Sequence, residues 1–257
     1  MTDFVKMHGC GNDFILLDGR KDDFSYLLAD SGRLATLCDR RFGIGCDQFI
    51  VIGQGQSGAD ADMIIRNSDG SIAGMCGNAA RCVASILMRE SGQGSVTLSV
   101  GDRLLKANRT GDLVTIDMGL ALSEGKADVG IEGLPIATTV DMGNPHTVFA
   151  VQNADDVDLA HIGPMIETHR LFPNKTNVEF ISTLSNGIRM RVWERGAGIT
   201  LACGSGACAS ALAAHRLGLA PSRMDVVMDG GTLILEIASD GRILMTGPAT
   251  HVYRGTF

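Results

Sequence analysis

The strongest constraint on the fold is one short pattern that occurs twice, about half the chain apart. Residues 75–88 read MCGNAARCVASILM, and residues 202–215 read ACGSGACASALAAH. Each has a cysteine, a glycine and a small polar residue, followed by small and apolar residues. The two leading cysteines, Cys76 and Cys203, are 127 positions apart in a chain of 257. Internal similarity of this kind indicates a duplicated architecture.

Three further pairs of segments repeat in the same order. Residues 11–14 resemble residues 143–146, at an offset of 132, and ADMIIRNSDG before Cys76 corresponds to GIRMRVWERG before Cys203. After each cysteine segment, the turns TGD, DGG and SDG separate strands of period two, as hairpins require. Each match alone is weak, and coincidence among glycine-rich turns is the alternative. Four matches in order favour two related halves.

The composition of the repeated segments predicts one buried helix in each half. Residues 78–90 and 205–217 have helical composition and stop near Gly92 and Gly218. Both are small or apolar on nearly every face, so each helix is expected to be buried on all sides. We therefore expect a central helix wrapped by a curved sheet in each half. The polar connection at 117–128 places the halves at 1–117 and 118–247, with 248–257 returning to the first.

Charge and composition exclude several classes of protein. The chain is 45% hydrophobic, enough for a core, and its net charge of −7 disfavours binding to nucleic acid or to anionic membranes. It has no apolar run long enough to span a membrane and no visible signal peptide, so we expect a cytoplasmic protein. Seven cysteines, an odd number, argue against a disulfide scaffold and for a reducing compartment.

The two repeated cysteines are predicted to lie where a strand gives way to a helix. Asn78 and Ser205 are suitable N-caps, and Gly77 and Gly204 allow close backbone approach. A helix start presents unpaired N–H groups and the positive end of the helix dipole. It should therefore lower the pKa of a thiol and bind an anion. One small carboxylate ligand is expected between two such helix starts, with a thiol on each side.

This arrangement suits the inversion of a stereocentre next to a carboxylate. Inversion removes a proton from one face of the carbon and returns one to the other, so two groups are needed, one a thiolate and one a thiol. The negative charge that develops on the carboxylate oxygens would meet the helix N–H groups. The lysines lie in no evident Schiff-base motif, and we expect neither a cofactor nor a metal.

Packing is the alternative for any cysteine, because this residue often behaves as a small buried hydrophobe. It remains open for Cys76 and Cys203, although their symmetric placement favours a role in chemistry. A four-thiolate metal site would combine Cys76 and Cys203 with Cys82 and Cys208, but the spacings differ from those of zinc knuckles. We assign five cysteines to packing: Cys10, Cys38, Cys46, Cys82 and Cys208.

Several polar residues near the repeats are candidate ligands for a substrate. Glu194 and Arg195 are either a surface ion pair or a binding pair in which the planar arginine holds a carboxylate. His146 is either a satisfied core histidine or a group that tunes a thiolate. Asparagine in a turn is usually structural, but its clustering here argues for more. The other polar candidates are Asn12, Gln48, Asn67, Asn144 and Asn177.

The motifs together resemble the diaminopimelate epimerase family. They run in family order from Lys6 to Gly255, and are MHGCGNDFILLD, RRFGIGCDQFI, NSDGSIAGMCGNAARC, MGNPHTVFAV, KTNVEFI, RVWERGAGITLACGSGACAS and TGPATHVYRG. The resemblance implies a mixed α/β (α+β) fold of two pseudo-symmetric halves, each a barrel-like, mostly antiparallel sheet around a central helix. It implies a cofactor-independent isomerase that converts LL- to meso-diaminopimelate in lysine and peptidoglycan-precursor synthesis.

The resemblance also assigns roles by position. Cys76 corresponds to the family's catalytic donor and Cys203 to its acceptor in the forward direction. His146 and Glu194 correspond to positions that modulate the thiol pKa values, and Tyr253 to a contact of the family's homodimer. The positions that match substrate-binding residues are Asn12, Gln48, Asn67, Gly77, Asn78, Asn144, Asn177, Glu194, Arg195, Gly204 and Ser205.

The chain departs from the family pattern without losing any proposed catalytic or binding group. Gly74, Ala79 and Ile199 replace frequent acidic, glycine and glutamate residues, and Cys10 and Cys46 replace small or apolar ones. Proline racemases and hydroxyproline epimerases share the implied fold but resemble Cys-Gly-His at the first thiol. The phenazine-pathway isomerases lack the thiol pair. A redox-sensing thiol protein that binds carboxylates is the alternative outside catalysis.

Overall fold

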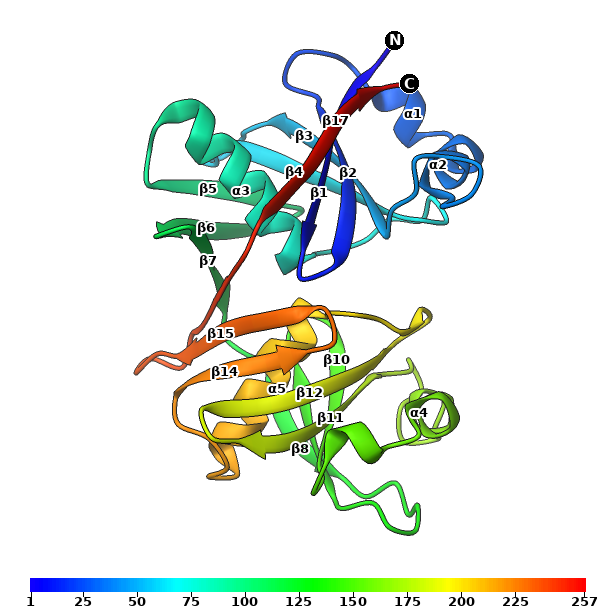
Figure 1. The fold of residues 1–257 in the computed structure, drawn as a ribbon, viewed down its shortest axis with the longest axis vertical. Helices are drawn as coiled ribbons and strands as arrows, with labels where there is room; N and C mark the ends of the chain where they lie inside the picture. Colours follow the sequence, from blue (N-terminus) through cyan, green and yellow to red (C-terminus); the bar gives the residue numbers. More distant parts are fainter. The chain divides into compact units, whose positions relative to one another are not determined.

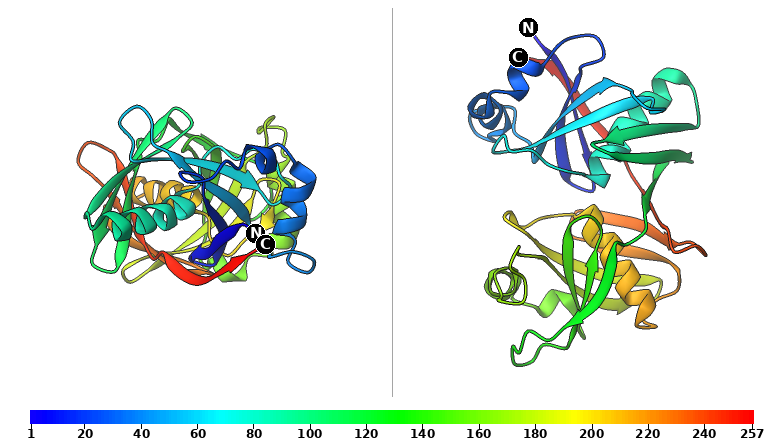
Figure 2. Two further views of the ribbon diagram at one scale, coloured as in Figure 1. Left: turned by 90° about the horizontal axis from the view of Figure 1, so that it is seen from above. Right: turned by 180° about the vertical axis from the view of Figure 1, so that it is seen from behind.

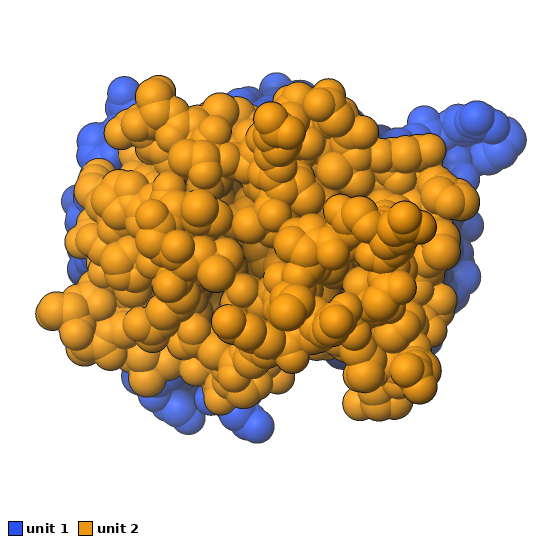
Figure 3. Space-filling view, turned by 90° about the horizontal axis from the view of Figure 1, so that it is seen from below, with its two compact units in different colours: residues 1–116, 247–257 blue, residues 117–246 orange.

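The computed structural model describes residues 1–257 and divides them into two compact units, which Figure 3 distinguishes by colour. The first unit comprises Met1–Ile116 and Gly247–Phe257, and the second comprises Asp117–Thr246. The boundaries expected from the sequence, 117/118 and 247/248, lie one residue further along the chain. No helix is long and apolar enough to cross a membrane.

The first unit contains eight strands and three helices (Figure 1). Its strands are β1 (Asp3–Gly9), β2 (Asn12–Asp18), β3 (Gln48–Gln54), β4 (Ala61–Asn67), β5 (Ser95–Val100), β6 (Arg103–Thr110), β7 (Leu113–Gly119) and β17 (Thr250–Thr256). Its helices are α1 (Ser25–Leu28), α2 (Ser31–Cys38) and α3 (Gly77–Ser91). The last strand, β17, pairs with β1, so the end of the chain belongs to this unit.

The second unit repeats this plan with its own elements. Its strands are β8 (Ser123–Ala127), β9 (Ala137–Asp141), β10 (Pro145–Ala150), β11 (Asn177–Leu184), β12 (Gly187–Glu194), β13 (Gly198–Ile199), β14 (Arg223–Met228), β15 (Gly231–Ile237) and β16 (Ile243–Gly247). Its helices are η1 (Ala154–Asp156), α4 (Leu159–Glu167) and α5 (Gly204–Arg216). The segment 117–128 is therefore not the bare polar connection expected from its composition, because it contains the end of β7 and all of β8.

Strand order and direction are the same in both units. The order is β17-β1-β2-β3-β4-β5-β6-β7 in the first and β8-β9-β10-β11-β12-β14-β15-β16 in the second. In each unit the third and fifth pairings are parallel and the other five are antiparallel. The short β13 adds to β12. The predicted mixed fold of two related, mostly antiparallel halves is confirmed.

The central helix of each unit occupies the concave side of its sheet. The α3 helix packs against β1 and β2 and also against β5 and β6, which are separated in strand order by β3 and β4. The sheet must therefore curve around the helix, and α5 meets β9 to β12, β14 and β15 in the same way. Figures 1 and 2 show each helix against the strands of its own unit.

Both central helices are buried over most of their length, α5 with small residues and α3 with the large side chain of Arg81 as well. The first half of α3 is entirely buried, and in α5 every residue is buried except Ser205, His215 and Arg216. The observed ends differ by one residue from the predicted ranges 78–90 and 205–217. Gly92 ends α3 in a left-handed conformation (φ 70°), and Gly218 follows α5 with a φ of 71°.

Candidate active site

The two repeated cysteines are themselves the N-caps of the central helices. The Sγ atom of Cys76 accepts a hydrogen bond from the backbone N–H of Ala79 (3.5 Å), and the Sγ of Cys203 accepts one from Gly206 (3.3 Å). The prediction that Asn78 and Ser205 are the caps was wrong. The preceding cysteine has extended backbone dihedrals in both units, and its sulfur takes the place usually filled by an oxygen.

In the first unit, Asn12 connects Cys76 to the strands. Its amide nitrogen donates to Asp47 Oδ2 (2.9 Å), which leaves its Oδ1 facing the helix start. There the Cys76 thiol donates to Oδ1 at 3.5 Å, and the Asn78 amide donates to the same atom at 3.1 Å. The orientation of Asn12 is therefore set by Asp47, a carboxylate that the sequence analysis did not single out.

Gln48 and Asn67 are cross-strand neighbours at one end of β3 and β4. Gln48 begins β3, Asn67 ends β4, and the two residues pair directly in the antiparallel ladder. The Gln48 amide donates to Asn67 Oδ1 at 3.1 Å, and Phe14 pairs with Gln48 across β2 and β3. The sequence placed both residues in turns, but both are strand termini.

Asp13 anchors the strand that carries Asn12. Its carboxylate pairs with the buried ammonium of Lys6 at 2.6 Å and with Arg40 at 2.7 Å. Burial opposes the charged form, but the hydrogen bonds and charges of Arg40 and Lys6 outweigh it and lower the Asp13 pKa to about 2. The Asp13 carboxylate also accepts the backbone N–H of Asp47, so it helps to hold the residue that orients Asn12.

The Asp13 ion pairs predict a component of acid sensitivity. Because the folded pKa is about 2, below the ordinary 3.8, this carboxylate stabilises the fold above the unfolded pKa and loses that contribution as pH falls toward 2. Asp13→Asn should lower the free energy of unfolding at pH 7 by about 1–2 kcal/mol and change it little near pH 2. Urea denaturation at both pH values measures the difference, with the exposed-turn variant Asp112→Asn as control. An equal loss at both pH values would contradict the assignment.

In the second unit, polar side chains surround Cys203 on one side. The Ser205 hydroxyl lies 3.6 Å from the Cys203 sulfur and accepts from the Asn144 amide nitrogen at 3.2 Å. Asn144 Oδ1 faces His146 Nε2 at 3.1 Å. Asn144, His146 and Ser205, which the sequence singled out, thus form a connected group next to the thiol.

The environment of Cys203 raises its pKa rather than lowering it. Burial is the largest cause, and the carboxylates of Glu194 and Glu179 raise the pKa further. The hydrogen bonds of Ser205 and of the Gly206 N–H act in the opposite direction but do not prevail. The expectation that a helix start lowers the pKa of this thiol was wrong.

Glu179 is the site residue of the second unit that the sequence analysis missed. It lies on β11 and is fully buried, and its Oε1 is 2.6 Å from His146 Nδ1. Its Oε1 also approaches the first turn of α5, where a Cβ on Gly206 would lie 2.7 Å away. The segment KTNVEFI contains the only signal, a single charged residue between apolar ones.

Asn177, Glu194 and Arg195 meet where β11 begins and β12 ends. The Asn177 amide donates to the Pro145 carbonyl at 2.8 Å and its Oδ1 accepts from the Arg195 backbone N–H at 2.9 Å. Glu194 accepts a hydrogen bond from the Thr200 hydroxyl. The Arg195 guanidinium donates to the carbonyl of Asn174 at 3.1 Å.

The other cysteines and Tyr253 complete the residues that the sequence singled out. Cys38 and Cys46 are buried with their sulfur atoms 3.4 Å apart, Cys10, Cys82 and Cys208 are also buried, and no cysteine is in a disulfide. No group of three or more His, Cys, Asp or Glu side chains is placed to hold a metal ion. Tyr253 lies on β17, is 42% exposed, and packs edge-on against Phe4.

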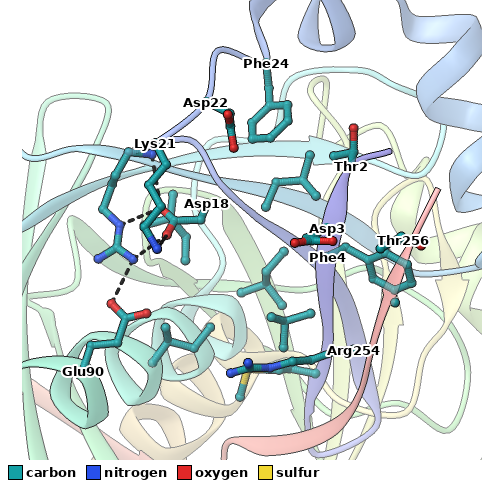
Figure 4. A pocket seen from close by; sticks show the side chains of 18 of the residues that line it. Thr2, Asp3, Phe4, Asp18, Lys21, Asp22, Phe24, Glu90, Arg254 and Thr256 are labelled. Carbon is teal, nitrogen blue, oxygen red and sulfur yellow. Dashed lines mark hydrogen bonds and ion pairs between the residues drawn. The ribbon is translucent and has the colours of Figure 1, made fainter.

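A cavity of about 840 Å³ lies elsewhere in the first unit, between β1, β17, the segment 18–26 and α3 (Figure 4). Asp18, Arg20 and Glu90 form ion pairs at its wall. None of the predicted catalytic or substrate-binding residues lines it. The cavity is therefore separate from the helix starts that carry the candidate cysteines.

The sequence of the chain matches a known family over nearly its whole length. The diaminopimelate epimerase family pattern covers residues 4–122 and 138–252. A diaminopimelate epimerase of Rhodospirillum centenum is 44% identical over 267 residues, covering 98% of this chain and 91% of the relative. One from Bacteroides thetaiotaomicron is 44% identical over 262 residues, covering 98% and 96%.

Solved structures share the fold at low sequence identity. A phenazine biosynthesis protein of Enterococcus faecalis superimposes with a TM-score of 0.73 at 10% identity, covering 99% of this chain and 98% of the other. A hydroxyproline epimerase of Agrobacterium vitis gives 0.65 at 15%, covering 99% and 91%. These likenesses establish the two-unit fold alone. The family match and the full-length relatives carry the assignment, and the chain belongs to the diaminopimelate epimerase family of amino-acid isomerases.

Proposed function

We propose that the chain interconverts LL- and meso-diaminopimelate without a cofactor, using Cys76 and Cys203 on opposite faces of one α-carbon. A thiolate takes the α-proton, and the electrons of the broken C–H bond move into an enediolate at the carboxylate. The other thiol then gives its proton to the opposite face. The products are the epimer and the same two sulfurs with their protonation states exchanged.

The observation that carries this proposal is that the same cysteine-capped helix start occurs in both units. The hydrogen bonds at the two sulfurs nevertheless differ. Both sulfurs accept a backbone N–H, but Cys76 also donates to Asn12 Oδ1 as a thiol does, whereas Cys203 lies against the Ser205 hydroxyl. This difference supports a proton donor at Cys76 and an acceptor at Cys203.

Each helix start supplies a means of stabilising the intermediate. In each helix, the cysteine sulfur accepts a hydrogen bond from one backbone N–H of the first turn. The neighbouring N–H groups at Gly77–Asn78 and Gly204–Ser205 are proposed to bind the reacting carboxylate. These groups and the helix dipoles would stabilise charge as it develops on the carboxylate oxygens. They would also lower the pKa of the α-carbon, which is the main barrier to removing its proton.

The far end of diaminopimelate carries a second ammonium and a second carboxylate. We assign its binding to polar groups at the strand ends, where Arg195 matches a carboxylate and Glu194 an ammonium. The proposed substrate-binding residues are Asn12, Gln48, Asn67, Asn144, Asn177, Glu194 and Arg195, with Asn78 and Ser205 at the helix starts. His146 and Glu194 are proposed to modulate the thiols.

The assembly and location of the enzyme belong to the same proposal. We place Tyr253 in a homodimer contact, since Val252 and Tyr253 expose large side chains next to each other on β17. A cytoplasmic enzyme is consistent with a mechanism that requires two reduced thiols.

Exchange of hydrogen with solvent tests the reaction. Reduced enzyme incubated with LL-diaminopimelate in deuterated water should form the meso isomer with solvent deuterium at one α-carbon. Mass spectrometry and NMR of the product measure both results. No deuterium at that carbon would overturn the proposal, and thiol oxidation without any turnover would favour a redox-sensing protein instead.

A further inference from the structure

The two units differ at the pair of residues beneath the helix start. His146 begins the parallel pairing of β10 with β11, and Phe14 holds the equivalent place between β2 and β3. On the partner strands, Glu179 of β11 and Ile50 of β3 are equivalent, because each lies two residues beyond the residue that pairs with His146 or Phe14. The first unit therefore packs an apolar pair where the second has a histidine and a carboxylate, and all four side chains are buried.

The need to hold the helix against the strands does not account for this polar pair. Glu179 Oε1 is bonded to His146, but its Oε2 is buried without a hydrogen-bond partner, which is costly for a carboxylate. The first turn of α5 carries Gly206 beside the carboxylate, whereas α3 has Ala79 at the equivalent position. The second unit accommodates a charge that the fold itself does not need, because the first unit is built without one.

Hydrogen bonds run without interruption from this carboxylate to the thiol. Glu179 Oε1 is 2.6 Å from His146 Nδ1, and His146 Nε2 is 3.1 Å from Asn144 Oδ1. The Asn144 amide nitrogen is 3.2 Å from the Ser205 hydroxyl oxygen, which is 3.6 Å from the Cys203 sulfur. Every member except Ser205 and Asn144 is buried.

The direction of these bonds follows from their donors. Because the Asn144 nitrogen donates to Ser205, the Asn144 oxygen must accept, and His146 must carry hydrogen on Nε2. One proton then lies between His146 Nδ1 and Glu179. The Ser205 hydroxyl, having accepted from Asn144, is left with its hydrogen for the Cys203 sulfur. From His146 onward each group donates toward the thiol, which is the direction that stabilises a thiolate, whereas the Glu179 charge itself raises the Cys203 pKa.

We propose that Glu179 is a positioning residue for the epimerisation: it shares a proton with His146 Nδ1 and so holds the ring with its Nε2 hydrogen on Asn144, so that Asn144 and Ser205 donate toward the Cys203 thiolate. This rests on the proposed function, in which Cys203 acts as the base. It acts on one thiol only, because the first unit has phenylalanine and isoleucine at the equivalent positions. The carboxylate touches neither substrate nor sulfur and works through His146.

Two replacements of Glu179 separate orientation from simple packing. In Glu179→Gln, the side-chain amide can donate to His146 Nδ1 and thereby keep hydrogen on Nε2. In Glu179→Met, which has a similar length, Nδ1 loses its partner. We expect the glutamine variant to retain kcat within about threefold and the methionine variant to lose about tenfold or more, the range for lost outer partners of a reacting group. KM should change less than kcat in both.

A double variant keeps the test valid if the single Glu179 variants fail to fold. His146→Phe with Glu179→Ile copies the apolar pair of the first unit into the second, so it preserves packing and removes the first two members of the chain of donors. It should fold and lose at least as much kcat as Glu179→Met. Glu236→Gln, an exposed glutamate of the same unit paired with Arg223, is the matched control and should behave as wild type.

The outcomes distinguish this proposal from the function on which it rests. If wild type neither epimerises diaminopimelate nor exchanges hydrogen, the function fails, while ¹⁵N NMR of His146 still tests whether Nε2 carries hydrogen. If wild type is active, full activity in the double variant would overturn the role of Glu179. So would a glutamine variant as impaired as the methionine one, or an Nε2 without hydrogen in wild type.

Discussion

Cys203→Ala should reduce epimerisation at least about 10³-fold, and Cys76→Ala should do the same. A positioned proton donor or acceptor contributes about 10²–10⁴-fold to a rate. Here the loss lies toward the upper end, because inversion cannot finish when one face of the carbon has no group to give or take a proton. Conversion of LL- to meso-diaminopimelate, measured with each variant in both directions, tests this expectation.

Cys82→Ala is the matched control for these two variants. Cys82 lies on the same helix as Cys76, is fully buried, and burial raises its pKa to about 12. Its loss should remove some packing and leave turnover intact. Substantial epimerisation by either Cys76→Ala or Cys203→Ala would show that one thiol suffices, and the two-thiol assignment would then be wrong.

The repeat, the two central helices and the fold class could be predicted from the sequence because all three depend on local composition. Small and apolar residues on nearly every face of 78–90 and 205–217, up to the last turn, favour burial wherever the helix lies. The strand order could not be predicted in the same way. The pairing of β2 with β3 joins residues 14 and 48, and that of β4 with β5 joins 61 and 98, contacts that no local pattern specifies.

Glu179 and Asp47 escaped detection for the same physical reason. A single glutamate in a strand usually marks a solvent-facing position, and only the pairing of β11 with both β10 and β12, together with α5, buries Glu179 on all sides. Asp47 stands beside a predicted ligand, Gln48, but its role depends on Asn12 approaching from another strand. Burial and long-range partners are properties of the assembled sheet.

The expectation that the helix start lowers the Cys203 pKa was wrong because the effect of a helix dipole is smaller than the effect of burial. A helix dipole stabilises a nearby charge by about 0.3–1 kcal/mol, and by about 2 kcal/mol in favourable cases. Full burial can shift a pKa by several units, each worth about 1.4 kcal/mol, and two carboxylates add to that shift here. The sequence revealed the helix start but neither the depth of the thiol nor Glu179. The donor chain that we propose from His146 to Ser205 would oppose this shift when the thiolate forms.

Gly206→Ala should lower kcat about 100-fold and lower the free energy of unfolding by no more than about 2 kcal/mol. The new Cβ would lie 2.7 Å from Glu179 Oε1 and 3.2 Å from the Cys203 sulfur. The carboxylate or the thiol must move, and a displacement of about 1 Å at a reacting group can cost about 10²-fold in rate. Alanine in a helix is favoured over glycine by about 1 kcal/mol, which offsets part of the overpacking cost of about 1–3 kcal/mol.

Gly94→Ala separates this effect from a general response to a methyl group. Gly94 lies in the exposed turn before β5, and a Cβ there would meet no atom within 4 Å. That variant should retain wild-type kcat and melting temperature. If Gly206→Ala keeps its activity, the first turn of α5 tolerates a methyl group against the carboxylate, and the close approach of Glu179 to Gly206 is not required for turnover. The first unit already carries this methyl group, because Ala79 of α3 is equivalent to Gly206. The variant therefore tests the contact with Glu179 rather than the tolerance of a helix start for alanine.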